Sequence, residues 1–314
     1  MPDVQASPGA GKAALNPPIT ASPASRGLAA ATGAFAIWGL FPLYIKGLAS
    51  VPALEITAHR VAWSLVLILA WMAARRELGN LAAALTRRGV LIRLIASAIL
   101  VSINWLVFVW AVNQNRVVEV SLGYYINPLM NVVLGIFVLS ERLNRTQWVA
   151  VGLAAAGVAY LTIQTGALPW VALTVATSFA LYGLIRKTAN VDALPGLGIE
   201  MAVLTPFAVG YLIWCEANGV GALGHSGLTI DILLVASGVV TAVPLFLFSY
   251  GARRIPYSTV GVLQYLAPTL QLASGIVFFG EPFQGARVVG FVFIWVALLL
   301  YAGDGLWRVR ARRA

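Results

Sequence analysis

Charged residues are scarce in this chain of 314 residues. Asp, Glu, Lys and Arg together make up only 10% of it, whereas hydrophobic residues make up 60% and the mean hydropathy is +0.86. Soluble domains carry roughly a quarter charged residues, because their surfaces must be hydrated. A chain with so few charges cannot cover a water-facing surface of that size. The composition therefore predicts an integral membrane protein.

Cysteine and histidine are also nearly absent, with Cys215, His59 and His225 as the sole members. One cysteine forms no disulfide within the chain, and two distant histidines form no metal cluster. The sequence also lacks a glycine-rich loop that ends in Gly-Lys-Ser/Thr, so ATP hydrolysis is not expected. We therefore expect no metal, no cofactor and no enzymatic activity.

Neither end of the chain carries a long apolar segment. Residues 1–26 are rich in Ala, Pro, Ser and Gly and have no apolar core of signal-peptide length, which predicts a disordered cytoplasmic tail. Residues 307–314 form a basic tail that has the charge of a phosphate-binding patch. In a multispanning protein, however, cytoplasmic ends are basic because orientation requires it. No nucleic-acid partner is therefore expected.

A membrane-spanning helix needs about 20 mostly apolar residues. Such runs predict ten helices, at 27–46, 55–74, 91–113, 117–139, 146–165, 167–186, 196–215, 228–251, 257–279 and 286–306. With both termini in the cytoplasm, all Lys and Arg residues fall on the cytoplasmic side except Lys46, Arg60, Arg116 and Arg287. This bias predicts a multi-pass membrane protein with both termini in the cytoplasm. Between the second and third helices, leucines on one helical face predict a short interfacial helix.

The chain also carries an internal repeat. At a shift of 140 residues, the identical pairs include Tyr125 with Tyr265, Pro128 with Pro268, Gly135 with Gly275 and Glu141 with Glu281. These pairs predict two five-helix repeats, at 27–165 and 167–306. Because five is odd, the second repeat would enter the membrane from the opposite face, as in many secondary transporters. The alternative is a duplication that merely enlarges a helix bundle.

Polar residues inside spans are costly and usually face the protein interior. In the second predicted helix, Glu55, His59 and Trp63 share a face, with Arg60 beside them. A carboxylate and an imidazole at this spacing can pair and carry a proton. Glu119, at the start of the fourth helix, is a third candidate for proton coupling. The alternative for the second helix is a salt-bridge cluster that anchors its end.

Two helices at equivalent places in the repeats carry a proline after a tyrosine. A proline within a helix removes one backbone hydrogen bond and opens the preceding turn. Carbonyls freed there can bind a solute or meet a neighbouring helix. We expect two kinked helices that face one another across the pathway, although kinks also serve packing alone. Glu141 and Glu281, at the ends of these helices, are expected to anchor them.

Several short runs carry a family resemblance. They are Asn104–Asn113, Ser121–Leu129, Glu141-Arg142-Leu143, Gly251-Ala252-Arg253-Arg254, Gln264-Tyr265 and Gly280-Glu281-Pro282. The chain resembles the RarD branch of the EamA family, within the drug/metabolite transporter superfamily, from about Gly33 to Leu300. The resemblance implies a ten-helix permease of the cytoplasmic (inner) membrane. It also implies a central cavity lined by the first, third and fourth helices of each half.

The predicted substrate pathway combines these arguments. Its residues are Trp38, Asn104, Trp110, Asn113, Tyr125, Asn127, Pro128, Gln264, Tyr265 and Pro268. We expect a secondary transporter for a small organic solute, driven by a gradient and working by alternating access within the lipid bilayer. One alternative is an integral membrane enzyme acting on a lipid carrier, which needs convergent His and Asp or acidic metal motifs. Another is a non-transporting sensor or channel. The sequence defines no oligomeric state.

Overall fold

The computed structural model describes residues 22–139, 144–189, 191–252, 254–255, 259–260 and 263–311. Within these residues the chain forms helices and no strand. The helices are α1 (Pro23–Lys46), α2 (Ala53–Ala74), α3 (Leu78–Leu85), α4 (Arg88–Asn113), α5 (Val117–Leu139), α6 (Arg145–Thr165), α7 (Trp170–Thr188), α8 (Ala193–Ala217), α9 (Leu228–Ala252), α11 (Leu266–Val277) and α12 (Ala286–Ala311).

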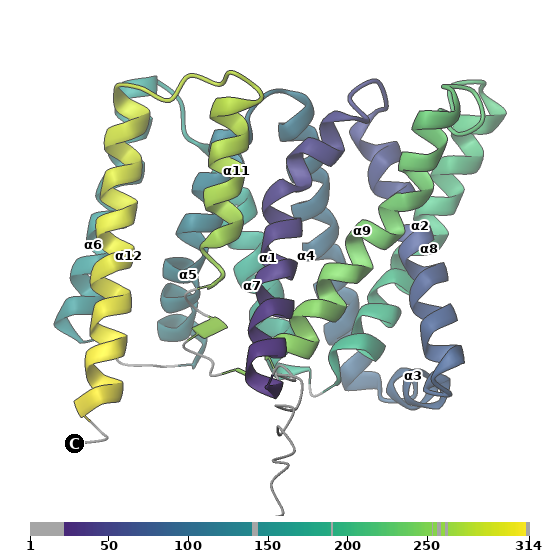
Figure 1. Ribbon diagram of the computed structural model, residues 1–314, viewed down its shortest axis with the longest axis horizontal. Coiled ribbons are helices and arrows are strands. Elements are labelled where there is room, and N and C mark those ends of the chain that lie inside the picture. Colours follow the sequence, from purple (N-terminus) through teal and green to yellow (C-terminus); the bar gives the residue numbers. More distant parts are fainter. Residues whose placement is uncertain are drawn as a thin grey trace, which may run out of the picture.

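The long helices run side by side from one face of the molecule to the other (Figure 1). In the part of the chain that is described, eight helices are long and apolar enough to cross a membrane, and α7 and α11 are shorter apolar helices. The predicted all-α membrane protein is thus confirmed. The start of α1 and the end of α12 lie at the same face (Figure 1).

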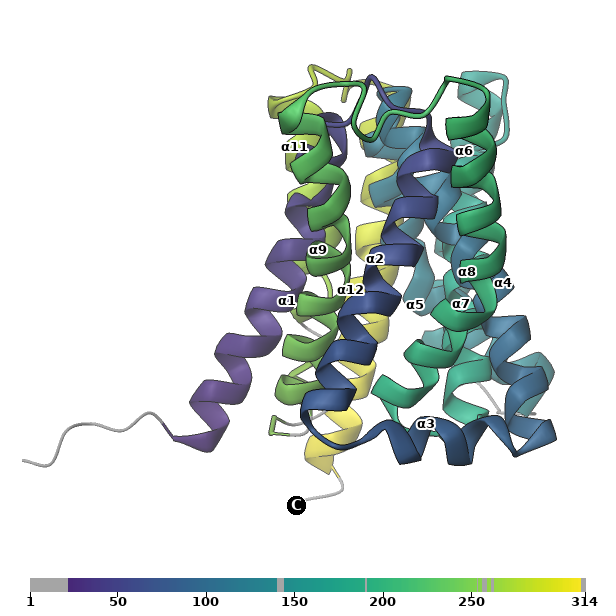
Figure 2. The ribbon, with the colours of Figure 1, turned by 90° about the vertical axis from the view of Figure 1, so that its right-hand side faces the viewer.

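The short helix α3 lies across that face, roughly perpendicular to the long helices (Figure 2). It confirms the short helix predicted between the second and third spans. α1 begins at Pro23, within the segment predicted as a tail, because Ser22 caps it by accepting from the backbone N–H of Ser25. Glu141, one of the two residues predicted to anchor helix ends, lies outside the described residues.

The ninth predicted span, 257–279, differs from the observed structure. Gln264 and Tyr265 form a turn, and α11 begins only at Leu266. Pro268 therefore lies in the first turn of a helix, where the missing N–H would have no intrahelical partner, and not in mid-helix as predicted. Pro128, its counterpart in the first half, does lie inside α5.

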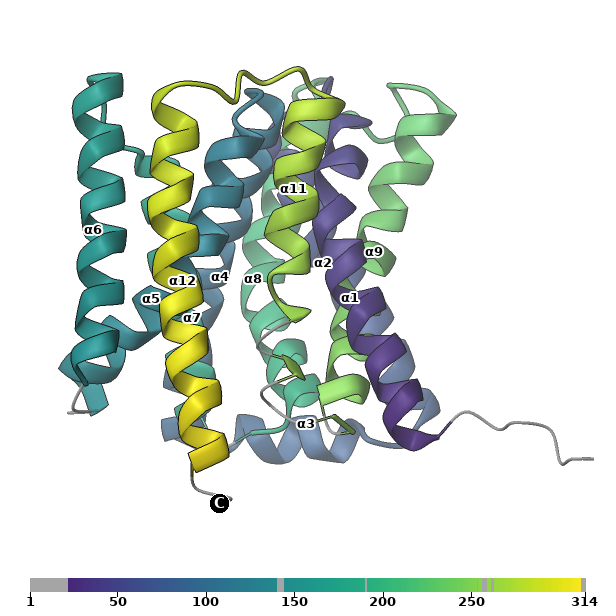
Figure 3. The same ribbon diagram turned by 60° about the vertical axis from the view of Figure 1, so that its left-hand side comes forward.

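Helices from the two halves of the chain pack against each other. α1 contacts α9 and α11, α2 contacts α8 and α9, and α7 contacts α4 and α5. α5 also contacts α11, while α6 and α12 lie side by side at one edge of the bundle (Figure 3). The hydrophobic core is therefore shared between the halves.

Glycines allow two of these contacts to be close. A Cβ added to Gly123 of α5 would lie 2.6 Å from the carbonyl oxygen of Ala172 in α7. A Cβ added to Gly238 of α9 would lie 2.5 Å from the carbonyl carbon of Trp63 in α2. Small residues at such positions let helix backbones approach closely, which is a main source of helix association in membranes.

Candidate functional site

Arg60 of α2, a buried cation, lies where four helices meet. Its side chain is only 4% exposed. The guanidinium carbon is 4.6 Å from the ring centroid of Phe41 in α1 and 4.5 Å from that of Trp105 in α4. The Nε–H donates to the hydroxyl oxygen of Thr241 in α9 at 3.3 Å. One positive charge is thereby held by both halves of the chain.

No carboxylate in the described part of the chain forms an ion pair with Arg60. Its Nη1 atom is buried and has no hydrogen-bond partner among the described residues. Removing an ion from water costs several kcal/mol, and a desolvated cation–π contact returns about 2 kcal/mol. The rings of Phe41 and Trp105 therefore offset only part of the cost, and the positive charge is incompletely neutralised.

Aromatic rings extend from Arg60 towards α5. Phe41 stacks on Tyr44, with centroids 5.6 Å apart and an interplanar angle of 16°. Phe41 also contacts Phe108 at 5.6 Å, and Phe108 contacts Tyr124 of α5 at 6.2 Å. The hydroxyl of Tyr44 donates to the carbonyl of Leu233 in α9. The cation thus lies beside a row of aromatic rings and contacts Phe41 within it.

Asn104, a predicted pathway residue, joins this row to α7. The Tyr124 hydroxyl donates to Asn104 Oδ1 at 3.2 Å. Asn104 Nδ2 donates to the carbonyl of Val175 at 3.0 Å and to the hydroxyl of Ser178 at 3.1 Å. Asn104 is fully buried, and both of its polar atoms have partners. Its contacts hold α4, α5 and α7 together beside the Arg60 site.

Two further polar groups without partners lie on the same face of α2 as Arg60. Trp63 and Ser64 follow it at i+3 and i+4, which places all three on one helical face. Trp63 Nε1 and Ser64 Oγ are buried and make no hydrogen bond to any described residue. This face of α2 therefore carries three hydrogen-bond donors that the described structure leaves unused or partly used.

Glu200 of α8 lies 140 residues after Arg60, the same shift that relates Tyr125 to Tyr265. It is fully buried but has several partners. It accepts from the hydroxyls of Ser97 at 2.5 Å and Tyr182 at 3.3 Å, and it pairs with Arg186 Nε at 3.6 Å. The sequence showed no partner for Glu200, because those residues come from α4 and α7.

The structure brings together the two tyrosines that the repeat relates. The rings of Tyr125 and Tyr265 stack, with centroids 6.4 Å apart and an interplanar angle of 17°. The Tyr125 hydroxyl hydrogen-bonds the hydroxyl of Thr269 at 2.6 Å. Beside them, Asn127 Nδ2 donates to the carbonyl of Ala176 at 3.1 Å. The helices α5 and α11 are thus in contact.

Two further predicted pathway residues, Trp38 and Gln264, lie close to α11. Trp38 belongs to α1 and Gln264 to the turn before α11. The ring of Trp38 packs on Phe35 at 5.6 Å and on Phe248 at 5.7 Å. Its carbonyl accepts from Gln271 Nε2 at 3.2 Å, which ties α1 to α11. Gln264 is half-buried in the turn before α11.

Trp110 and Asn113 lie apart from the central residues, at the end of α4. Trp110 contacts Trp170 at 5.2 Å and lies beside the guanidinium of Arg116 at 5.6 Å. Asn113 Nδ2 donates to the carbonyl of Val51 at 3.4 Å. Trp110 and Asn113 line an open cleft of about 310 Å³ together with residues 49–53.

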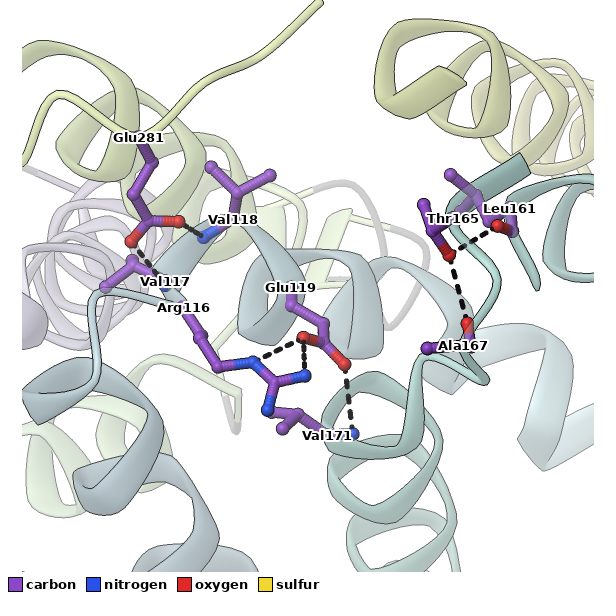
Figure 4. A network of polar contacts seen from close by, with 9 residues as sticks. All are labelled: Arg116, Val117, Val118, Glu119, Leu161, Thr165, Ala167, Val171 and Glu281. Atoms are coloured by element: carbon purple, nitrogen blue, oxygen red, sulfur yellow. Dashed lines mark hydrogen bonds and ion pairs between the residues drawn. The ribbon is translucent and has the colours of Figure 1, made fainter. Parts of the chain in front are cut away.

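Carboxylates cap helices at the same end of the molecule (Figure 4). Glu281 accepts from the backbone N–H groups of Val117 at 2.6 Å and Val118 at 2.8 Å, at the start of α5. These bonds give Glu281 the anchoring role predicted for it. Burial raises the pKa of Glu281, and the two N–H groups act in the opposite direction.

The three candidates for proton coupling have different surroundings. Glu119 pairs with Arg116 Nη2 at 2.5 Å and caps α7 through the N–H of Val171 at 3.1 Å (Figure 4). Glu55 accepts from the N–H of Ala222 at 2.6 Å, and its Oε2 is buried without a described partner. His59 is buried, and no hydrogen bond joins it to Glu55 among the described residues.

Comparisons with known proteins agree on one family. The EamA-like transporter family model matches residues 25–163 and 168–303. An uncharacterized transporter of Pseudomonas aeruginosa is 46% identical over 90% of this chain and 95% of its own length. The RarD proteins of Escherichia coli and Streptomyces exfoliatus are 41% and 42% identical, over 91% and 92% of this chain and 96% and 91% of their own lengths.

A solved structure titled "Crystal structure of protein" shares the fold, with a TM-score of 0.57 at 19% identity over 88% of this chain and 96% of that one. The family and the names of the relatives indicate a membrane transporter rather than an enzyme. This chain belongs to the EamA-like transporter family, as a RarD-type member.

Proposed function

We propose that the protein is a secondary transporter that moves a small organic solute, a metabolite or a drug-like molecule, across the cytoplasmic membrane by alternating access. The observation that carries this proposal is a symmetry of the helix contacts. Exchanging α1 with α7, α2 with α8, α4 with α9, α5 with α11 and α6 with α12 turns each of the largest contacts into another observed contact or into itself. For example, α1 on α9 becomes α7 on α4.

Such a symmetry is what two oppositely inserted five-helix repeats produce. The two family matches, at 25–163 and 168–303, support repeats at 27–165 and 167–306. In this proposal α7 and the interrupted segment that includes α11 complete ten spans. A pseudo-twofold axis in the membrane plane then places the binding site near the bilayer centre, where either face can open.

The orientation follows from the basic residues. Arg75, Arg76, Arg87 and Arg88 flank α3 at the face where α1 begins and α12 ends. Under the positive-inside rule this face is cytoplasmic, so both termini belong to the cytoplasm. Trp110 and Asn113 then lie at the outer mouth of the pathway, while Asn104, Asn127 and the pair of tyrosines lie deeper.

Orientation and inversion can be tested together by cysteine labelling. In a Cys215→Ser background, Ser50→Cys reports the loop before α2, and Thr188→Cys reports its repeat counterpart at the end of α7. We expect a membrane-impermeant thiol reagent to label Ser50→Cys in intact cells and Thr188→Cys only after the cells are opened. Labelling of both from the same side would contradict the inverted repeat.

Transport itself needs a ligand, which a thermal-shift screen against metabolites and antibiotics can identify, because a ligand that binds the folded state raises Tm. Each hit is then tested in liposomes for counterflow. A carrier shows trans-stimulation by solute on the far side, whereas a channel or sensor does not.

Proton coupling through Glu55 or His59 is part of the proposal. It is abandoned if alanine at both positions leaves uptake driven by a pH gradient unchanged.

A further inference from the structure

We propose that Arg60 is the recognition site for the cargo, and that the cargo is an organic anion with one carboxylate and an apolar body. This inference deepens the proposed transport function and rests on it. The juxtaposition that carries it is a buried guanidinium in contact with aromatic rings from α1 and α4, with no carboxylate paired to it in the described chain.

The comparison with Glu200 shows that burial alone does not explain Arg60. The repeat places both residues at equivalent positions on α2 and α8. Glu200 is neutralised by Arg186 and hydrogen-bonded by Ser97 and Tyr182. Among the described residues Arg60 makes one hydrogen bond, to Thr241, and its Nη1 has no partner there. A buried charge that has no anionic partner in the described part of the chain is suited to an anion that binds and leaves.

The geometry favours a carboxylate over a neutral solute. The rings of Phe41 and Trp105 contact the guanidinium carbon of Arg60, and its Nη1 donates to no described residue. A guanidinium binds a carboxylate through two parallel N–H···O bonds, which a lysine ammonium cannot reproduce. The hydroxyl of Thr241 accepts from Arg60 Nε, so its own proton is available to a second acceptor.

The surroundings favour an apolar or aromatic body on that anion. The rings of Phe41, Phe108 and Tyr124 form a continuous row beside Arg60. Phe41 and Phe108 are buried among other apolar side chains. An anion that reaches Arg60 is therefore surrounded by apolar and aromatic groups, which suit an apolar body.

The first test needs no ligand. Arg60→Met replaces the cation by an apolar side chain, and Arg186→Met is the matched control, because it removes the partner of the buried Glu200. We expect the Tm of ligand-free Arg60→Met to equal or exceed that of the wild type, and the Tm of Arg186→Met to fall. A fall in Tm for Arg60→Met as large as for the control would show that Arg60 is structural and would overturn the inference.

The second test measures binding by thermal shift with benzoate, phenylacetate and indole-3-acetate, each beside its neutral amide. We expect at least one acid to raise the Tm of the wild type while its amide does not. We expect Arg60→Met to lose this shift and Arg60→Lys to need at least about tenfold more acid for it. Equal shifts by the amide, a shift retained in Arg60→Met, or no shift by any acid would each overturn the inference.

Counterflow in liposomes separates this inference from the transport proposal. If a neutral solute shows trans-stimulation that Arg60→Met retains, the transporter stands and the anion site fails. If an acid binds through Arg60 without any counterflow, the anion site stands and the transport proposal fails.

Discussion

Tyr125 and Tyr265, which are 140 residues apart in the sequence, lie ring on ring with centroids 6.4 Å apart. They come from α5 and from the turn before α11, at equivalent places in the two halves. The Tyr125 hydroxyl also bonds Thr269 in the first turn of α11. The contact between the halves therefore combines an aromatic stack with a hydrogen bond.

The hydrogen bond between Tyr125 and Thr269 gives a first prediction. We expect Tyr125→Phe to lower the unfolding free energy by about 1 kcal/mol, because one hydroxyl is left without its partner. Thr269→Val should have a similar effect, and the double variant should lose less than the sum of the two. Chemical unfolding in detergent measures all three. Strict additivity would mean that the two hydroxyls are not coupled.

A second prediction concerns the close approach of α5 and α7. Gly123→Ala should lower the unfolding free energy by about 1–3 kcal/mol, because the new methyl group meets the backbone of Ala172 at 2.6 Å. Gly210→Ala in α8 is the matched control, since no described atom lies within 4 Å of its added Cβ. That variant should be neutral or gain up to about 1 kcal/mol from helix propensity. Equal Tm values for both variants would argue against the close contact.

The cap at the start of α5 gives a third prediction. Glu281→Ala removes the acceptor of two backbone N–H groups and should cost about 1–3 kcal/mol in unfolding free energy. Glu77→Ala is a control, because its ion pair with Arg75 is exposed and long, at 3.8 Å. It should change stability by less than about 1 kcal/mol. Thermal unfolding of both variants checks the difference.

His225 provides a prediction about pH. Its hydrogen bond to Glu216 raises the pKa of His225 above the ordinary 6.5. Any stabilisation from this pair is fully present below pH 6.5 and is lost as the pH rises through the raised pKa. Histidine-selective NMR titration of the protein should show the elevated pKa. Glu216→Gln should return it towards 6.5, and an unchanged value would show that the pair does not form in solution.

Much of the fold is predictable because apolar runs are a local signal. The spans over 117–139 and 228–251 agree with α5 and α9 within one residue at each end. The failure at 257–279 has a physical cause. Apolar composition reports that a segment suits lipid, and it does not report where the helix is interrupted, here at Gln264 and Tyr265.

The candidate site is less predictable because its partners are distant in sequence. Glu55 and His59 share a helical face, but Glu55 instead accepts from the N–H of Ala222, which is 167 positions away. The sequence does not predict a special role for Arg60, which neighbours that pair. Its contacts with Phe41 and Trp105 form only when α1, α2 and α4 pack together. The available signal in the sequence is that Arg60 is one of the few basic residues that do not fall on the predicted cytoplasmic side.

The interruption before α11 has a consequence for the working cycle of such a carrier. Two identical repeats would make the inward-open and outward-open forms equal in energy. Here α5 is continuous through Pro128, whereas its counterpart restarts at Leu266. In the proposed cycle the two forms are therefore not related by exact symmetry, and nothing requires their free energies to be equal.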